Sequence, residues 1–184
     1  MGDARFDRST AAIREALLRL LVAKRLDGIS MAEVARMAGV SRSTLYSHYG
    51  NVLDIYRSLV VEFLAGLRSL GAHLHCGECF EAGGRPFCVA LRSAGPYAPV
   101  VRDARFMSTL FSVAEEKGLV NDMLDTYAKL GTSPLQAEAL FRFQMSGCYA
   151  VAMSDVPNGE WEVVQRTLDA FIRGGINAVR VPLG

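Results

Sequence analysis

The 184-residue sequence lacks several features that would assign it to a membrane, secreted or catalytic class. No run of about 18 apolar residues is present, so the sequence predicts no membrane-spanning helix. The first residues, MGDARFDRST, are charged and contain no apolar signal-peptide core, so we expect a cytoplasmic protein. Its four cysteines are therefore expected to be reduced thiols or metal ligands, and not a disulfide framework.

Catalytic patterns are also scarce. The sequence has no glycine-rich phosphate loop and no Ser/His/Asp order of a known type. The paired carboxylates Glu115 and Glu116 are expected on the surface of a helix. We therefore predict that the protein is not an enzyme.

Net charge offers only a weak indication of a nucleic-acid partner, because it is +1 for the whole chain. The first 60 residues are slightly basic, with nine Arg or Lys against six Asp or Glu. A dimer would thus present two weakly basic ends on an acidic body, which is a modest electrostatic footprint.

The strongest pattern is a helix-turn-helix between residues 30 and 49. Ser30 and Glu33 have the spacing of a capping box, which starts a helix. Gly39 suits the turn that follows, because a positive φ costs little without a Cβ. Ser41 is an N-cap for a second short helix. The framework predicted for this motif comprises Ser30, Glu33, Ala38, Gly39, Val40 and Leu45.

The second helix of the motif leaves a polar and aromatic face outward. Arg42 near its N-terminus can reach guanine edges or phosphates, and the hydroxyls of Thr44 and Tyr46 can bind phosphates. Such a helix reads base edges with its N-terminal residues. The predicted DNA contacts are Arg42, Ser43, Thr44, Tyr46, Ser47 and His48.

The run AEVARMAGVSRSTLYSHYGNVLDIY resembles the DNA-binding head of the tetracycline-repressor (TetR) family, over about Thr10 to Tyr56. The resemblance implies an all-α fold, with a three-helix head at 1–50 and a helical effector-binding and dimerisation body at 51–184. A long helix 4, at about 51–70, would connect them. It also implies a homodimeric repressor of double-stranded operator DNA, released by a small apolar or amphipathic effector. Val52 stands where the family usually has a phosphate-binding Lys, so either that contact is lost, which would weaken operator binding, or another residue supplies it.

The rest of the chain is predicted to be helical, because no stretch shows sustained two-residue alternation. A glycine-rich break at 71–85 precedes expected helices at 86–93, 99–104, 105–117, 120–130, 134–153 and 160–179. Gly147, Gly174 and Gly175 lie inside the last two, where small residues allow helices to approach closely. These two helices are the expected face of a two-fold dimer, as in the resembled family, although intramolecular packing alone is the alternative.

Adaptable apolar residues between helix 4 and the terminal helices indicate an effector pocket in the body. Any one of them is also expected in an ordinary core. The predicted pocket residues are Phe63, Leu67, Phe106, Met107, Leu110, Phe111, Met123, Tyr127, Phe143 and Met145.

A histidine and cysteine cluster falls within the glycine-rich break. His73, His75, Cys76 and Cys79 offer nitrogen and sulfur ligands of the kind that zinc prefers. A Cys76–Cys79 pair closing under oxidant is a second possibility, and an inert connecting loop is the third. A metal- or thiol-responsive regulator is therefore the alternative function, and no other cofactor is expected.

Overall fold

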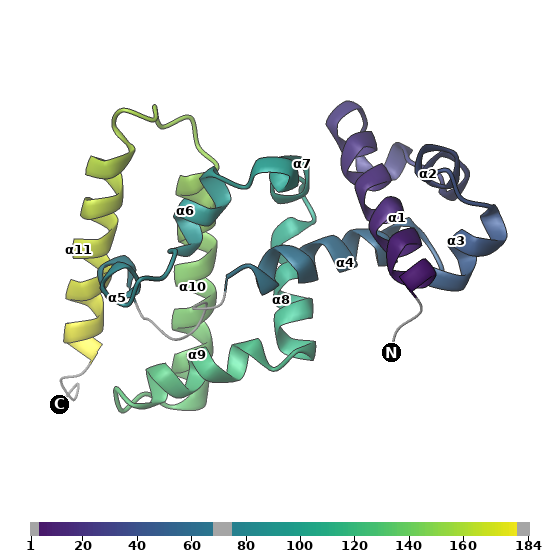
Figure 1. Ribbon diagram of the computed structural model, residues 1–184. Coiled ribbons are helices and arrows are strands. Elements are labelled where there is room, and N and C mark those ends of the chain that lie inside the picture. Colours follow the sequence, from purple (N-terminus) through teal and green to yellow (C-terminus); the bar gives the residue numbers. More distant parts are fainter. Residues whose placement is uncertain (1–3, 68–74, 180–184) are drawn as a thin grey trace. The chain divides into compact units, whose positions relative to one another are not determined.

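Every regular element in the described part of the chain, residues 4–67 and 75–179, is a helix in the computed structural model (Figure 1). The all-α prediction is therefore confirmed. The chain divides into two compact units, and the first of them is discontinuous in sequence. The first unit comprises Met1–Ala65 and Ala94–Val113, and the second comprises Gly66–Ser93 and Ala114–Gly184.

The first unit contains the predicted head together with segments far beyond it. Its elements are α1 (Ala4–Ala23), η1 (Leu26–Gly28), α2 (Met31–Ala38), α3 (Arg42–His48), α4 (Val52–Ala65), η2 (Gly95–Tyr97), α7 (Ala98–Val101) and the first part of α8 (Phe106–Glu116). Helix α1 packs against α2, α3, α4 and α7. Because α4 packs on α1, it belongs with the head as a packing unit. The predicted boundary after residue 50 separates the DNA-binding part from the effector-binding part, and it stays a prediction.

The core of the first unit is built where the apolar stripes of these helices meet. Ile13 and Leu17 of α1 are fully buried, as are Val34 of α2 and Leu45 of α3. From α4 the aromatic side chain of Tyr56 enters the same unit, and its hydroxyl donates a 3.1 Å hydrogen bond to the Val100 carbonyl. The returning segment 94–113 thus completes the core that the head begins.

Helix α4 is shorter than predicted. The sequence indicated a helix of about 51–70, whereas α4 ends at Ala65, giving a length of about 21 Å. Gly66 and Leu67 are not helical, and the remainder of the predicted span lies outside the described residues. Buried Phe63 packs edge-on against Phe106, with ring centroids 5.8 Å apart.

The sequence pattern predicts a first helix from about Ser9 to Leu26, whereas helix α1 begins earlier. The Ser9 hydroxyl donates to the Arg5 carbonyl at 3.0 Å, and the Thr10 hydroxyl donates to the Phe6 carbonyl at 3.0 Å. Both side chains therefore bond back to the preceding turn, as Ser and Thr do inside a helix, and neither caps its end. The helix consequently starts at Ala4.

The second unit consists of helices whose predicted spans are confirmed to within a few residues, together with one that was missed. They are α5 (Cys76–Glu81), α6 (Phe87–Arg92), α9 (Leu119–Ala128), α10 (Pro134–Ala152) and α11 (Trp161–Val179). Helix α10 packs against α6 and α9, and α11 packs against α5 (Figure 1). Ser133 and Gln136 form a capping box that starts α10, with Pro134 in its first turn.

Helix α5 lies inside the segment that the sequence predicted as a glycine-rich break, so that prediction was wrong here. His75 stands at the N-cap position of this helix, and its Nδ1 lies 3.4 Å from the Glu78 amide nitrogen. Asp169 of α11 accepts a 2.7 Å hydrogen bond from the Gly77 amide. The second of these contacts joins residues 92 positions apart. The two contacts stabilise a helix start that the local sequence did not indicate.

Helix α11 buries very little of its surface in the single chain. Only Gln165, Asp169 and Ile176 are fully buried along its 19 residues, and Ile176 is the one apolar side chain among them. Phe171 of α11 and Phe143 of α10 remain 67% and 69% exposed. An amphipathic helix of this length normally buries a whole apolar stripe.

Candidate DNA-binding interface

The first helix of the motif, α2, starts at the predicted capping box. The Ser30 hydroxyl accepts a 3.3 Å hydrogen bond from the Glu33 amide, and the Glu33 carboxylate accepts one of 2.9 Å from the Ser30 amide. Hydrogen bonding from Lys24, followed by that from Ser30, lowers the pKa of Glu33 to about 2. The carboxylate therefore stays ionised in all but strongly acidic solution.

The turn between α2 and α3 has the geometry that only a residue like glycine adopts easily. Gly39 has φ +66°, in the left-handed region. Its amide donates to the Arg36 carbonyl at 3.3 Å, and the Val40 amide donates to the Ala35 carbonyl at 3.1 Å. This pair of bonds is a Schellman motif, which ends α2 and redirects the chain. Ala38 and Val40 are half-buried beside it.

The second helix of the motif, α3, is capped and anchored as predicted. The Ser41 hydroxyl accepts a 3.0 Å hydrogen bond from the Thr44 amide, and Leu45 is completely buried. With Leu45 fixed inward, the opposite face of α3 must point to solvent. Arg42, Ser43, Tyr46 and Ser47 are exposed and Thr44 is half-buried.

An additional arginine joins this face. Arg36 and Arg42 line one shallow depression beside the turn, together with Glu33 and Val40. Two guanidinium groups in one depression suit phosphate oxygens, to which Arg binds with a planar fork of donors. Arg36 was not among the predicted contacts, because the apolar pattern of α2 drew attention only to its inward side.

His48 has a structural role that the sequence did not reveal. Its Nε2 lies 2.8 Å from the Ser9 hydroxyl and its Nδ1 lies 3.0 Å from the Thr10 hydroxyl. Its ring also stacks on Phe6, with centroids 4.0 Å apart. Both ring nitrogens are thus engaged by α1, and His48 fastens the end of the recognition helix to that helix. Its predicted contact with DNA stays a prediction.

A second polar connection lies just behind the recognition helix. Arg14 Nε donates to the Tyr49 and Ser58 hydroxyls at 3.2 Å each, and the Ser58 hydroxyl donates to that of Tyr49 at 3.2 Å. Arg14 also lies 3.7 Å from the Glu62 carboxylate. Helix α1, the end of α3 and helix α4 are therefore joined by one network.

The start of α4 carries the departure from the resembled family. Asn51 and Asp54 exchange hydrogen bonds, of 3.0 Å to the Asn51 side chain and 3.1 Å to the Asp54 carboxylate. The helix begins at Val52, which is half-buried. A well-formed helix start with an apolar first residue therefore occupies the place of the usual phosphate-binding lysine.

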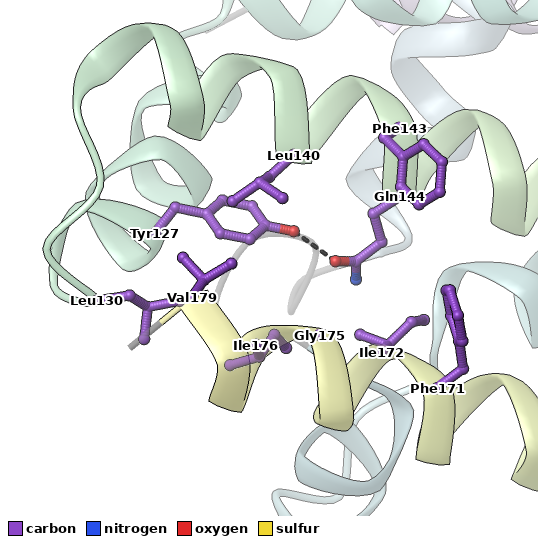
Figure 2. Close-up of a pocket in the computed structure, with 10 residues that line it drawn as sticks. All are labelled: Tyr127, Leu130, Leu140, Phe143, Gln144, Phe171, Ile172, Gly175, Ile176 and Val179. Atoms are coloured by element: carbon purple, nitrogen blue, oxygen red, sulfur yellow. Dashed lines mark hydrogen bonds between the residues drawn. The ribbon is translucent and has the colours of Figure 1, made fainter. Parts of the chain in front are cut away.

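The second unit contains an apolar pocket of about 90 Å³ between α9, α10 and α11. The Tyr127 hydroxyl donates to the Gln144 side-chain oxygen, and this pair faces inward among apolar side chains (Figure 2). Burial raises the pKa of Tyr127, so its hydroxyl keeps the proton that it donates. The lining consists of Tyr127, Leu130, Leu140, Phe143, Gln144, Phe171, Ile172, Gly175, Ile176 and Val179.

Two of the predicted effector residues, Tyr127 and Phe143, line this pocket. The structure gives the others a place elsewhere: Phe63, Phe106 and Leu110 are buried in the first unit, and Met123 and Met145 are buried in the second. The eight predicted residues that do not line the pocket are Phe63, Leu67, Phe106, Met107, Leu110, Phe111, Met123 and Met145.

The histidine and cysteine cluster is not gathered around one point. His73 lies outside the described residues, and His75 is paired with Asp169 at 3.0 Å. The sulfur of Cys76 lies beside that of Cys88, whereas Cys79 is buried in α5. Across residues 4–67 and 75–179, no three His, Cys, Asp or Glu side chains are placed to hold a metal ion.

The described geometry defines a class, that of helix-turn-helix DNA-binding transcription regulators. Residues 13–58 match the model of a family described as bacterial regulatory proteins, tetR family. The resemblance of this head to the tetR family is therefore confirmed. Members of this family are transcription factors and not enzymes. None of the described helices is both long and apolar enough to cross a membrane.

Two solved structures are similar to the chain at low identity. The fatty acid degradation regulator FadR from Bacillus halodurans is 15% identical, with a TM-score of 0.47, over 100% of this chain and 98% of that one. The TetR family repressor AlkX from Dietzia sp., implicated in biodegradation of n-alkanes, is 16% identical, with a TM-score of 0.38. This similarity covers 90% of this chain and 96% of that one. No curated protein sequence matches the chain.

Proposed function

We propose that this transcription regulator acts in the cytoplasm as a homodimeric repressor, which leaves its operator when a small apolar or amphipathic effector binds the second unit. The observation that carries the DNA-binding part is the completed motif itself. Capped α2, the Gly39 turn and buried Leu45 hold the outward side chains of α3 in a fixed array.

The exposed face of α10 and α11 supports dimerisation. Only one apolar residue of α11 is buried in the single chain, while Phe143 and Phe171 remain exposed. A Cβ added at Gly147 or Gly174 would meet no atom of the chain within 4 Å, so packing within one chain does not explain these glycines. A second copy supplies the missing contacts by two-fold symmetry. Two heads then read two half-sites of one operator.

The pocket of the second unit supports the effector. Its lining is almost wholly apolar, with the Tyr127–Gln144 pair as the polar exception, and this composition is typical of small-molecule sites. A ligand shifts the protein between two states only by binding one of them better. Because α10 and α11 contribute both to the pocket and to the proposed dimer face, a ligand there is well placed to favour one arrangement of the dimer.

The test begins with DNA selected from a random pool by the wild-type protein. Thr44→Ala and Tyr46→Ala should each weaken binding to the selected DNA by roughly tenfold or more, since each lost base or phosphate contact costs about 1–3 kcal/mol. Glu81→Ala, an exposed change on α5, is the matched control and should bind as wild type does. Melting curves should be unchanged for all three. Undiminished binding by both α3 variants would show that α3 is not the reading helix.

A further inference from the structure

Two cysteine sulfurs of the second unit lie side by side although they are twelve residues apart in the sequence. Cys76 is the first residue of α5 and Cys88 lies in α6, and their Sγ atoms are 3.8 Å apart. Neither is in a disulfide. The pair differs from the Cys76–Cys79 pair suggested by the sequence, because the turn at 82–86 brings α6 back onto the start of α5.

The surroundings of the two sulfurs assign them different protonation. Hydrogen bonding from Cys76, the largest cause, lowers the pKa of Cys88, and the Gln165 amide nitrogen lies 3.8 Å from the same sulfur. The same hydrogen bond, followed by burial, raises the pKa of Cys76. Of the two sulfurs, Cys88 is therefore the one on which the thiolate, the nucleophilic form, is favoured.

The start of α5 is held in place from α11, which keeps Cys76 beside Cys88. Asp169, only 8% exposed, accepts hydrogen bonds from the Gly77 amide at 2.7 Å and pairs with His75 at 3.0 Å. Its other oxygen lies 3.1 Å from Arg173 Nε. A buried carboxylate with three partners is a firm anchor, because breaking it would leave an unpaired buried charge. Position 77 suits glycine, since a Cβ would approach Asp169 to 3.2 Å.

We propose that Cys76 and Cys88 are a peroxide-oxidised dithiol, which closes reversibly into an intramolecular disulfide. The Cys88 thiolate attacks the O–O bond of the peroxide, forming a sulfenic acid and releasing hydroxide, or alkoxide from an organic peroxide. The Cys76 sulfur then attacks the Cys88 sulfur, its thiol proton leaves with the sulfenic hydroxide as water, and the S–S bond forms. Because Cys88 is only 2% exposed, the oxidant must be small, and hydrogen peroxide is the probe.

The geometric demand of this step is modest. The sulfurs must move from 3.8 Å to about 2.05 Å apart, a closure of less than 2 Å between two short helices. Cys148 does not compete, because burial raises its pKa to about 12 and keeps it a neutral thiol. In a reducing compartment a disulfide of this kind is transient, as expected of a sensor and not of a structural bridge.

The bond joins two parts of the second unit that support different helices. Helix α5 packs on α11 and helix α6 packs on α10, so a Cys76–Cys88 bond links the supports of both helices of the proposed dimer face. An effect of oxidation on operator binding therefore rests on the proposed function, whereas formation of the disulfide does not.

The test is peroxide treatment of the full-length protein, followed by thiol titration and peptide mapping. Wild type should lose two of its four thiols and yield one linked pair, Cys76 with Cys88, and dithiothreitol should restore both thiols. The control variants Cys79→Ser and Cys148→Ser should each lose two of three. Cys76→Ser should form no disulfide, and mass spectrometry should show added oxygen on its Cys88 peptide.

Other outcomes would overturn the proposal. These are a linked pair other than Cys76 with Cys88, retention of all four thiols, or the same thiol loss in Cys76→Ser as in wild type. Should Cys88→Ser fail to fold, as judged by circular dichroism, Cys76→Ser still decides the question, because Cys76 is only half-buried. DNA binding is not needed for any of these readouts, so failure of the proposed function leaves the result interpretable.

Discussion

The two units of this regulator differ in how completely their helices are packed within a single chain. In the first unit, α3 is closed by a cap at its start, a buried leucine in its middle and His48 bound to α1 at its end. In the second unit, α11 has one buried apolar residue and an exposed phenylalanine. A reading surface has to be rigid before it meets DNA, whereas an association surface is completed only by its partner. The contrast separates stability that belongs to one chain from stability that depends on protein concentration.

The largest expected effect lies in the first unit. Leu45→Ala should lower the free energy of unfolding by about 3 kcal/mol, because it removes a fully buried side chain from the helix-turn-helix. Chemical denaturation at several protein concentrations measures it. We expect the loss itself to be independent of concentration. The neighbouring change Tyr46→Ala, at an exposed position, should cost less than about 0.5 kcal/mol. Equal losses for the two would contradict the idea of a self-contained head.

The next effect tests the second unit. Phe143→Glu should weaken self-association by about 2 kcal/mol, because it places a charge at the centre of the proposed dimer face. Sedimentation velocity over a range of concentrations measures the change. Phe80→Glu is the matched control, since Phe80 is also exposed but lies on α5. A dimer that tolerates Phe143→Glu but not Phe80→Glu would move the association face away from α10 and α11.

A smaller effect concerns the turn of the motif. Gly39→Ala should lower the free energy of unfolding by roughly 1–2 kcal/mol through the left-handed backbone alone, because no atom lies within 4 Å of the added Cβ. Gly28→Ala is the control, since that glycine has no positive φ and equally open space. Thermal melting of the two variants side by side measures the difference. If Gly28→Ala lowers the melting temperature more than Gly39→Ala does, the left-handed backbone at position 39 does not impose the expected cost on alanine.

The smallest expected effect is a gain. Val52→Lys should raise affinity for selected DNA by about threefold and steepen its salt dependence by about one phosphate contact per head. Val52→Gln, of similar length but neutral, should change neither quantity. Binding measured by fluorescence anisotropy at several salt concentrations distinguishes the two variants. Identical salt slopes would mean that the start of α4 does not approach the DNA backbone.

Sequence reasoning succeeded where the determining contacts are local. The capping box at Ser30, the Gly39 turn and the inward Leu45 are set by residues within a few positions of one another. It failed where distant partners decide. The start of α5 depends on Asp169, and the orientation of His48 depends on Ser9 and Thr10.

The residues of the candidate pocket show the same distinction between local patterns and distant contacts. Tyr127 and Phe143 were identified, because aromatic residues stand out in any helical body. Phe171 and Ile176 were not predicted as pocket residues, since membership of a pocket depends on how α9, α10 and α11 pack. The Cys76–Cys88 contact was missed for the same reason, although both cysteines were noticed in the sequence.

The discontinuity of the first unit has a consequence for the order in which the protein is made. Tyr56 and Phe63 of α4 are covered by Val100 and Phe106, which the ribosome adds about forty residues later. Until then, the helix that follows the recognition motif has apolar side chains without cover. We expect a fragment ending at residue 65 to fold poorly and aggregate. A fragment ending at residue 113 should fold without aggregating. The DNA-reading end of the molecule is thus first in the sequence, but its core is complete only after residue 113 has been made.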